Sequence, residues 1–158
     1  MVNIRDIVFA SAVGLASLLA GCGTAPKAPQ SYGQNFDLAV TAASVEPEHP
    51  TTDDHVTLYF TVKNEGPDRA PSSRFFLLRS ANNRESFDPY FRVLDVGPID
   101  SGAAKTLTIK LGGEPTGHMS LLGYTGVYSS GGDKQWDTDP RNDSARLSYT
   151  VMLAGQKE

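Results

Sequence analysis

The chain has 158 residues, with 14 lysines and arginines against 18 aspartates and glutamates, which gives a formal net charge of −4. This balance argues against a nucleic-acid-binding protein, because such proteins carry basic patches and a high pI. The one cysteine excludes an intramolecular disulfide and any zinc or iron–sulfur site built from several thiolates. The length fits one domain.

Residues 1–21 have the layout of a secretory signal. Arg5 is the one cation of its first segment, residues 7–20 carry no charge, and small residues lead to Cys22. An uncharged run of this length fits the roughly 7–15 residues of a signal peptide. A membrane-spanning helix needs about 20 apolar residues. The sequence therefore predicts a helical signal peptide over residues 1–21 rather than a retained membrane span.

The signal ends in Leu19-Ala20-Gly21-Cys22, which resembles the bacterial lipobox. The resemblance implies that Cys22 receives a diacylglyceryl group through a thioether and that a peptidase then cuts before it. The new amine is then acylated, and we expect no other cofactor. The alternative is an ordinary signal peptide with an incidental cysteine. Because several acyl chains hold a protein stably at a membrane, the resemblance implies a location in the cell envelope. Gly23, in place of aspartate, favours the outer membrane if the host is Gram-negative.

Residues 22–35 are predicted to form the acylated cysteine and a flexible tether. Pro26, Pro29 and Gly33 stand among polar residues in this stretch. About 13 extended residues span at most roughly 45 Å. The tether would therefore hold a folded domain clear of the lipid headgroups.

Residues 36–154 show the period-two alternation of half-buried β-strands. Alternation is regular over 56–63, 106–111 and 144–153, and less regular over 38–45, 75–79, 91–96 and 119–128. Turn-forming clusters lie at 46–50, 64–68, 97–102, 112–115 and 129–142. The pattern predicts an all-β fold, an antiparallel β-sandwich of about seven strands, with a small closed barrel as the alternative. Residues 155–158 are predicted to form a C-terminal tail.

Two stretches resemble the cell-adhesion-related domain found in bacteria (CARDB). The first contains Asp37-Leu38-Ala39-Val40 and then Thr61-Val62-Lys63-Asn64-Glu65-Gly66, which match a "DLxV" strand followed by a "TVxNxG" strand and turn. The second, Asn142-Asp143-Ser144-Ala145, matches the acidic turn before the last strand of that family. The resemblance implies an immunoglobulin-like or fibronectin-like β-sandwich over residues 36–154.

No catalytic motif stands out in the chain. His49, His55 and His118 are dispersed and lie outside any H-E-x-x-H arrangement, and nucleophile-elbow, Walker and dinucleotide-binding motifs are absent from the sequence. An acylated Cys22 is not available as an enzymatic nucleophile. The sequence therefore predicts a protein that is not an enzyme.

A basic and aromatic zone occupies residues 69–92. It interleaves five arginines with five aromatic residues: Arg69, Arg74, Arg79, Arg84 and Arg92 with Phe75, Phe76, Phe87, Tyr90 and Phe91. Guanidinium groups bind anionic groups, and aromatic faces stack on ligands. We take Arg79, Arg84, Arg92, Phe87 and Tyr90 as a candidate surface for a ligand or partner. The alternative is that the aromatic residues are core and the arginines line solvent-facing positions.

A second cluster is acidic. Asp133, Asp137, Asp139, Asn142 and Asp143 lie close together before the last predicted strand. Carboxylate oxygens suit Ca²⁺, which gives the hypothesis of a weak calcium site at Asp137, Asp139 and Asp143. The alternative is turn-forming chemistry of aspartate and asparagine, with no metal.

Together these features predict a lipoprotein anchored at a membrane of the cell envelope, with a non-catalytic binding or adhesion domain. The expected partners are an envelope protein or a cell-wall or surface glycan, and nucleic acid is not among them. The alternative function is a structural or assembly lipoprotein of a secretion or surface-appendage machine. An enzyme of the envelope comes third.

Overall fold

The computed structural model describes residues 35–82, 87–128, 134–135 and 138–155. The predicted signal peptide, Cys22, nearly all of the tether and most of the C-terminal tail lie outside these residues. In the described part of the chain, no helix is both long and apolar enough to cross a membrane.

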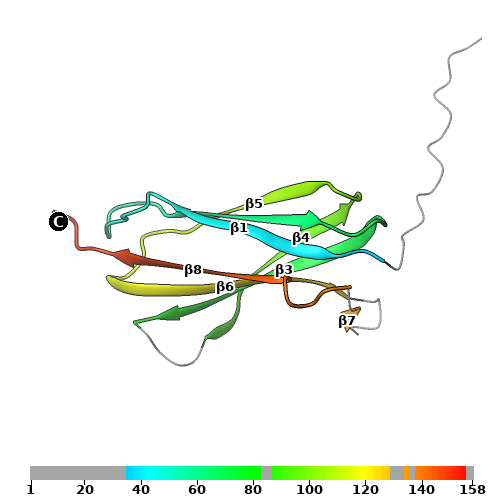
Figure 1. Cartoon of the computed structure of the whole chain (residues 1–158). Helices are drawn as coiled ribbons and strands as arrows, with labels where there is room; N and C mark the ends of the chain where they lie inside the picture. The colour runs from blue at the N-terminus through cyan, green and yellow to red at the C-terminus, as the bar shows by residue number, and fades with distance from the viewer. Residues whose placement is uncertain (1–34, 83–86, 129–133, 136–137, 156–158) are drawn as a thin grey trace, which may run out of the picture. The chain divides into compact units, whose positions relative to one another are not determined.

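The described residues form an antiparallel β-sandwich (Figure 1). The strands are β1 (Leu38–Glu46), β2 (Thr57–Asn64), β3 (Ala70–Ala81), β4 (Asp88–Ile99), β5 (Ala104–Lys110), β6 (Gly117–Tyr128), β7 (Lys134–Gln135) and β8 (Ser144–Val151). One sheet has the order β1-β2-β5, and the other has the order β4-β3-β6, with both β7 and β8 paired to β6. No pairing between the described strands joins the two sheets, which confirms the sandwich over the closed barrel.

Two of the predicted strands, 75–79 and 91–96, are shorter than the strands that the structure contains, β3 and β4. The turn cluster expected over residues 97–102 begins inside β4, which continues to Ile99. Gly97 has a φ of +73° and lies opposite Ser73, at an irregularity in the register. Pro98 is tolerated because β4 is the edge strand of its sheet, where a missing N–H breaks no ladder. β3 likewise extends well beyond the predicted 75–79.

The last strand is shorter than the alternation over residues 144–153 predicted, because β8 ends at Val151. Ala145, Leu147, Tyr149 and Val151 face the core side, but Leu153 is 53% exposed. The reason is that β8 ends at Val151, so Leu153 lies beyond the sheet that would cover it.

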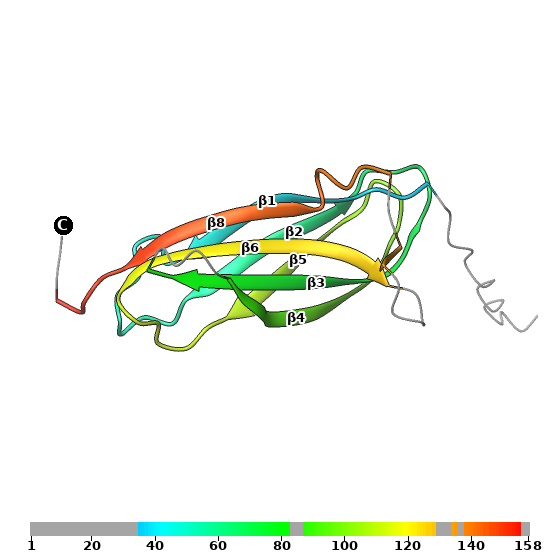
Figure 2. The same ribbon diagram turned by 90° about the horizontal axis from the view of Figure 1, so that it is seen from below.

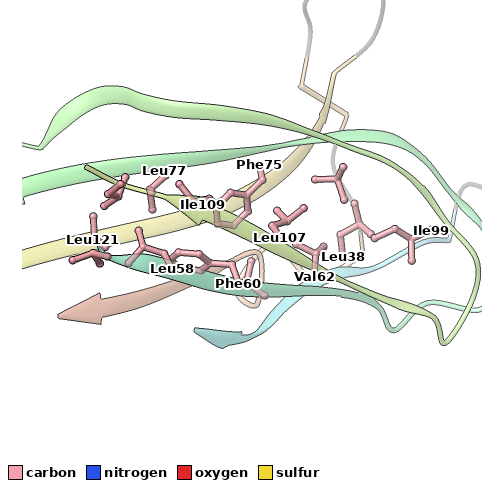
Figure 3. Close-up of a cluster of buried hydrophobic side chains, with 14 of the residues drawn as sticks. Leu38, Leu58, Phe60, Val62, Phe75, Leu77, Ile99, Leu107, Ile109 and Leu121 are labelled. Atoms are coloured by element: carbon pink, nitrogen blue, oxygen red, sulfur yellow. The ribbon is translucent and has the colours of Figure 1, made fainter. Parts of the chain in front are cut away.

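The core lies between the two sheets (Figure 3). Phe60 of β2 and Phe75 of β3 meet across the interface with ring centroids 4.9 Å apart. Gly123 of β6 leaves room for this pair, because a Cβ there would lie 2.4 Å from Phe75 and 2.8 Å from Phe60. The alternating apolar residues of β2 and β5 form the opposite wall, as predicted.

The "TVxNxG" stretch has a structural explanation. The fully buried Asn64 side chain accepts hydrogen bonds from the backbone N–H groups of Asp37 and Gly66, and donates to the carbonyls of Asp68 and Ile99. A Cβ on Gly66 would lie 2.4 Å from the carbonyl oxygen of Asn35. This asparagine and this glycine therefore join the start of β1, the turn after β2 and the end of β4.

Candidate functional site

The structure divides the predicted basic and aromatic zone between different environments. Arg84 lies outside the described residues, and only the backbone of Tyr90 is described, as part of β4. Phe87 is half-buried just before β4, and Arg92 is exposed. The described residues therefore leave this candidate surface untested, and its role in binding stays a prediction.

Arg79 is held on the core side of β3 by a carboxylate. Its Nη1 donates to both oxygens of Glu114, at 2.9 and 3.2 Å. Glu114 lies between β5 and β6, and its side chain is 6% exposed against 27% for Arg79. The guanidinium carbon of Arg79 also lies 4.0 Å from the centroid of the Phe91 ring, and that of Arg92 lies 4.5 Å from it. The charge of Arg79 is thus neutralised within the fold, and Arg92 carries the exposed charge beside the same ring.

Tyr149 lies close to this ion pair. Its hydroxyl is buried and has no hydrogen-bond partner among the described residues. Burial, and then the negative charge of Glu114, raise the pKa of Tyr149. The phenol therefore stays neutral under ordinary conditions, with one donor and one acceptor function unused.

Tyr149 also lines a cleft on one side of the sandwich, between β1 and β8. These are outer strands of different sheets and run side by side (Figures 1 and 2). Hydrogen bonds close the gap at each end, from Val40 N to Asn142 O at 2.9 Å and from Met152 N to Pro50 O at 3.0 Å. The cleft has a volume of about 620 Å³ and is lined by Ser44, Val45, Glu48, His49, Leu147, Ser148, Tyr149 and Thr150.

The backbone along this cleft is available for pairing. In the described part of the chain, β1 pairs only with β2, and β8 only with β6. Apart from these pairings, residues 43–46 and 147–150 make no backbone hydrogen bond to another described residue. A cleft with apolar side chains between two free strand edges has the chemistry to receive an extended peptide or an amphipathic ligand. The sequence contained only the alternation of each strand, so it did not indicate this site.

The acidic loop forms internal contacts. Both carboxylate oxygens of Asp139 accept hydrogen bonds from the Arg141 guanidinium, at 2.8 and 2.9 Å, and these bonds hold the pKa of Asp139 below its usual value. Asp143 is buried just before β8, and Asp137 lies outside the described residues. No group of three acidic, histidine or cysteine side chains in the described ranges is arranged to hold a metal ion. The calcium hypothesis stays untested, and turn formation accounts for the described contacts.

Similar structures define the fold. The crystal structure of the CARDB domain of the PF1109 protein from Pyrococcus furiosus, solved in complex with di-metal ions, aligns with a TM-score of 0.59 and 15% identity. The alignment covers 78% of this chain and 99% of that domain. A solution structure of the same domain gives a TM-score of 0.58 over 75% of this chain and 97% of that one. No protein-family model matches the chain, and no curated protein matches it in sequence.

A β-glucosidase from Erythrobacter marinus, EmGH1, also contains a similar domain. It aligns with a TM-score of 0.51 and 15% identity over 74% of this chain, but over only 16% of the enzyme. At these identities the likeness concerns the fold alone. The folded part of the chain is therefore a β-sandwich with the fold of these CARDB domains, as the sequence resemblance predicted.

Proposed function

We propose that this protein is a lipoprotein of the bacterial cell envelope whose CARDB-like domain is a non-catalytic binding module. The observation that carries the proposal is the tetrapeptide Leu19-Ala20-Gly21-Cys22, which contains the one cysteine of the chain and stands at the end of a signal-like segment. Anchoring raises the effective concentration of the domain near other envelope components, which strengthens even weak contacts.

The start of the folded domain supports this arrangement. Phe36 is buried, and its carbonyl accepts hydrogen bonds from the backbone N–H and the hydroxyl of Thr138. The fold thus begins about 13 residues after Cys22, which reach at most roughly 45 Å when extended. That spacing is enough for the domain to meet partners beyond the lipid headgroups.

The cleft between β1 and β8 supports a binding role for the domain. It combines free strand edges with the apolar side chains of Val45 and Leu147 and the polar residues Glu48 and His49. These groups suit a protein segment or a glycan, the two partner classes expected from the sequence.

Metabolic labelling with palmitate tests the anchor. The wild-type chain should incorporate the label and sediment with membranes, and Cys22→Ser should lose both properties. The matched control is the double variant Cys22→Ser/Ser31→Cys, which keeps one cysteine but places it outside the lipobox; it should also remain unlabelled. Label in the control, or unchanged membrane fractionation of Cys22→Ser, would contradict the proposal.

Retention on purified cell-wall sacculi tests the binding role and separates the two partner classes. If the partner is a glycan, the wild-type chain is retained, and Val45→Asp in the cleft or Arg92→Ala in the basic zone weakens retention. Leu153→Asp is the control, because Leu153 is exposed and does not line the cleft. Absence of retention for the wild type would leave protein as the partner class. Equal retention of all four proteins would exclude both surfaces from glycan binding.

A further inference from the structure

One wall of the cleft is a free backbone edge of β8. Alternate residues of an antiparallel strand bond to the neighbour on one side, and the residues between them face the other side. Asp143 bonds to Thr125 of β6, whereas Asn142 and Met152 bond to β1 and to the segment that follows it. The register of β8 with β6 is regular. The residues that direct their N–H and C=O groups toward β1 are therefore Ser144, Arg146, Ser148 and Thr150. None of these groups has a backbone partner among the described residues.

The opposite wall is a shorter free edge of β1. Val56, just before β2, accepts a hydrogen bond from the residue that follows β5, so the alternation along β2 directs Tyr59 toward β1. Tyr59 lies opposite Ser44 in a regular stretch of the register. Ser44 is therefore bonded to β2, and its neighbours Ala43 and Val45 direct their N–H and C=O groups toward β8. Both walls of the cleft thus present main-chain donors and acceptors.

Side chains of the core reach the cleft. Val45 and Leu147 line it and pack against the core, but both remain half-buried. The core residues Leu58 and Phe60 of β2 are by contrast fully buried. The core is therefore less completely covered along this flank of the sandwich. An occupant that places apolar side chains on Val45 and Leu147 would remove this apolar surface from water.

The two ends of the cleft limit the length of an occupant. The free edge of β8, from residue 144 to residue 150, spans roughly 20 Å at about 3.3 Å per residue. The hydrogen bonds of Val40 with Asn142 and of Pro50 with Met152 close the gap beyond both ends of this edge. Pairing of the β8 edges of two copies is disfavoured, because β1 of each copy already lies along this flank. A segment of about seven extended residues matches the free edge.

The chemistry of the cleft identifies its occupant. Main-chain donors and acceptors that recur at every second residue are complementary to the edge of another extended polypeptide, which is the basis of recognition by strand addition. Glu48 is the one formally charged residue among the described residues that line the cleft. A positively charged side chain in the occupant is therefore complementary to the cleft.

We propose that the cleft binds an extended protein segment, which adds as a strand to the free edge of β8. Alternate apolar side chains of the segment pack on Val45 and Leu147, and a lysine or arginine of the segment lies near Glu48. This inference rests on the binding role proposed above, and it selects protein rather than glycan as the partner of the cleft.

Selection from a library of seven-residue peptides displayed on phage tests the proposal, with the full chain in detergent as the bait. We expect enrichment of peptides that have apolar residues at alternate positions and a lysine or arginine. With Glu48→Lys as the bait, the charge preference should change to aspartate or glutamate. A selection that enriches no peptide, or one that gives the same charge preference on both baits, would overturn the proposal.

A proline substitution tests where the selected peptides bind. The Ser148 N–H points toward the cleft and away from β6, so Ser148→Pro leaves the ladder of the sheet intact. It should weaken binding of the selected peptides by roughly 10-fold or more, because a peptide carbonyl loses its donor. Thr108→Pro is the matched control. Thr108 is exposed on the edge strand β5, and its N–H points away from β2, but it does not line the cleft. This variant should bind the peptides like the wild type, and equal binding by all three proteins would refute the assignment.

Amide hydrogen exchange of the wild type, measured by NMR, needs no variant that could fail to fold. On addition of a selected peptide, exchange at Arg146, Ser148 and Thr150 should slow by roughly 10-fold or more, because these N–H groups gain partners. Exchange at Leu147 and Tyr149 should stay unchanged, because their N–H groups already bond to β6. Unchanged exchange at the first three residues would contradict strand addition.

The outcome is separable from that of the proposed function. These measurements are made in detergent, so they do not depend on whether Cys22 anchors the chain. If no peptide binds and Val45→Asp still weakens retention on sacculi, the cleft binds glycan. That result would overturn this inference and leave the binding role of the domain in place.

Discussion

Replacing Arg79 with methionine should lower the free energy of unfolding by about 3 kcal/mol, at the low end of the cost of removing one partner of a buried ion pair. The substitution removes both hydrogen bonds to Glu114 and leaves a carboxylate that is 6% exposed. The low end applies because 27% of the Arg79 side chain is exposed, so solvent already screens the pair in part.

Substitution of the other partner, Glu114→Gln, should lower the free energy of unfolding by only about 1.5 kcal/mol, because the amide oxygen still accepts a hydrogen bond from Arg79. Arg79 also keeps its contact with Phe91 and its access to water. In the double variant Arg79→Met/Glu114→Gln no charge is buried, so it should be about 2 kcal/mol more stable than the sum of the single effects predicts.

Urea unfolding followed by far-UV circular dichroism measures all three free energies by linear extrapolation. Arg141→Met serves as the control. It also removes a two-bond contact between an arginine and an aspartate, but Arg141 is 87% exposed and little change is expected. The reasoning would be refuted if Glu114→Gln cost as much as Arg79→Met, or if the double variant showed simple additivity.

Further outcomes follow from other contacts. Gly123→Ala should destabilise the fold by about 2 kcal/mol through overpacking against Phe75, and Phe75→Leu in the same chain, which lacks the clashing Cζ, should recover part of the loss in urea unfolding. Tyr149→Phe should leave stability at neutral pH unchanged or raise it by up to about 1 kcal/mol, because the hydroxyl lacks a partner. Burial raises the pKa of Tyr149 in the folded state, so the unfolded chain ionises first and the stability of the wild type declines as the pH rises above about 10. Tyr149→Phe should lose less stability in alkali. The hydrogen bonds from Arg141 lower the pKa of Asp139 in the folded state. Their small contribution to folding stability is therefore complete above about pH 4 and declines as the pH falls through the folded-state pKa. Arg141→Met should raise the pKa of the Asp139 carboxyl, as measured by NMR titration.

Local patterns were enough to predict the class of the fold. Alternation over residues 56–63 and 106–111 identified β2 and β5, because a side chain's face in a strand depends only on its position along that strand. The Asn64 and Gly66 motif was also readable as part of the resemblance, although its hydrogen bonds join the turn after β2 to Asp37 and Ile99, which are distant in sequence. Pro98 misled the prediction, because an edge strand tolerates proline and the sequence does not show which strand is at the edge.

The candidate site depended on contacts that are distant in sequence. Arg79 and Glu114 are 35 positions apart, and the strands that border the cleft come from opposite ends of the domain. Phe75 and Phe76 are adjacent and equally apolar, yet one joins the core and the other the outward face. The sequence by itself determined where strands form and which side chains share a face. Only the tertiary structure decided which face is covered and which carboxylate meets which guanidinium, because these depend on how the two sheets pack and not on the period of any one strand.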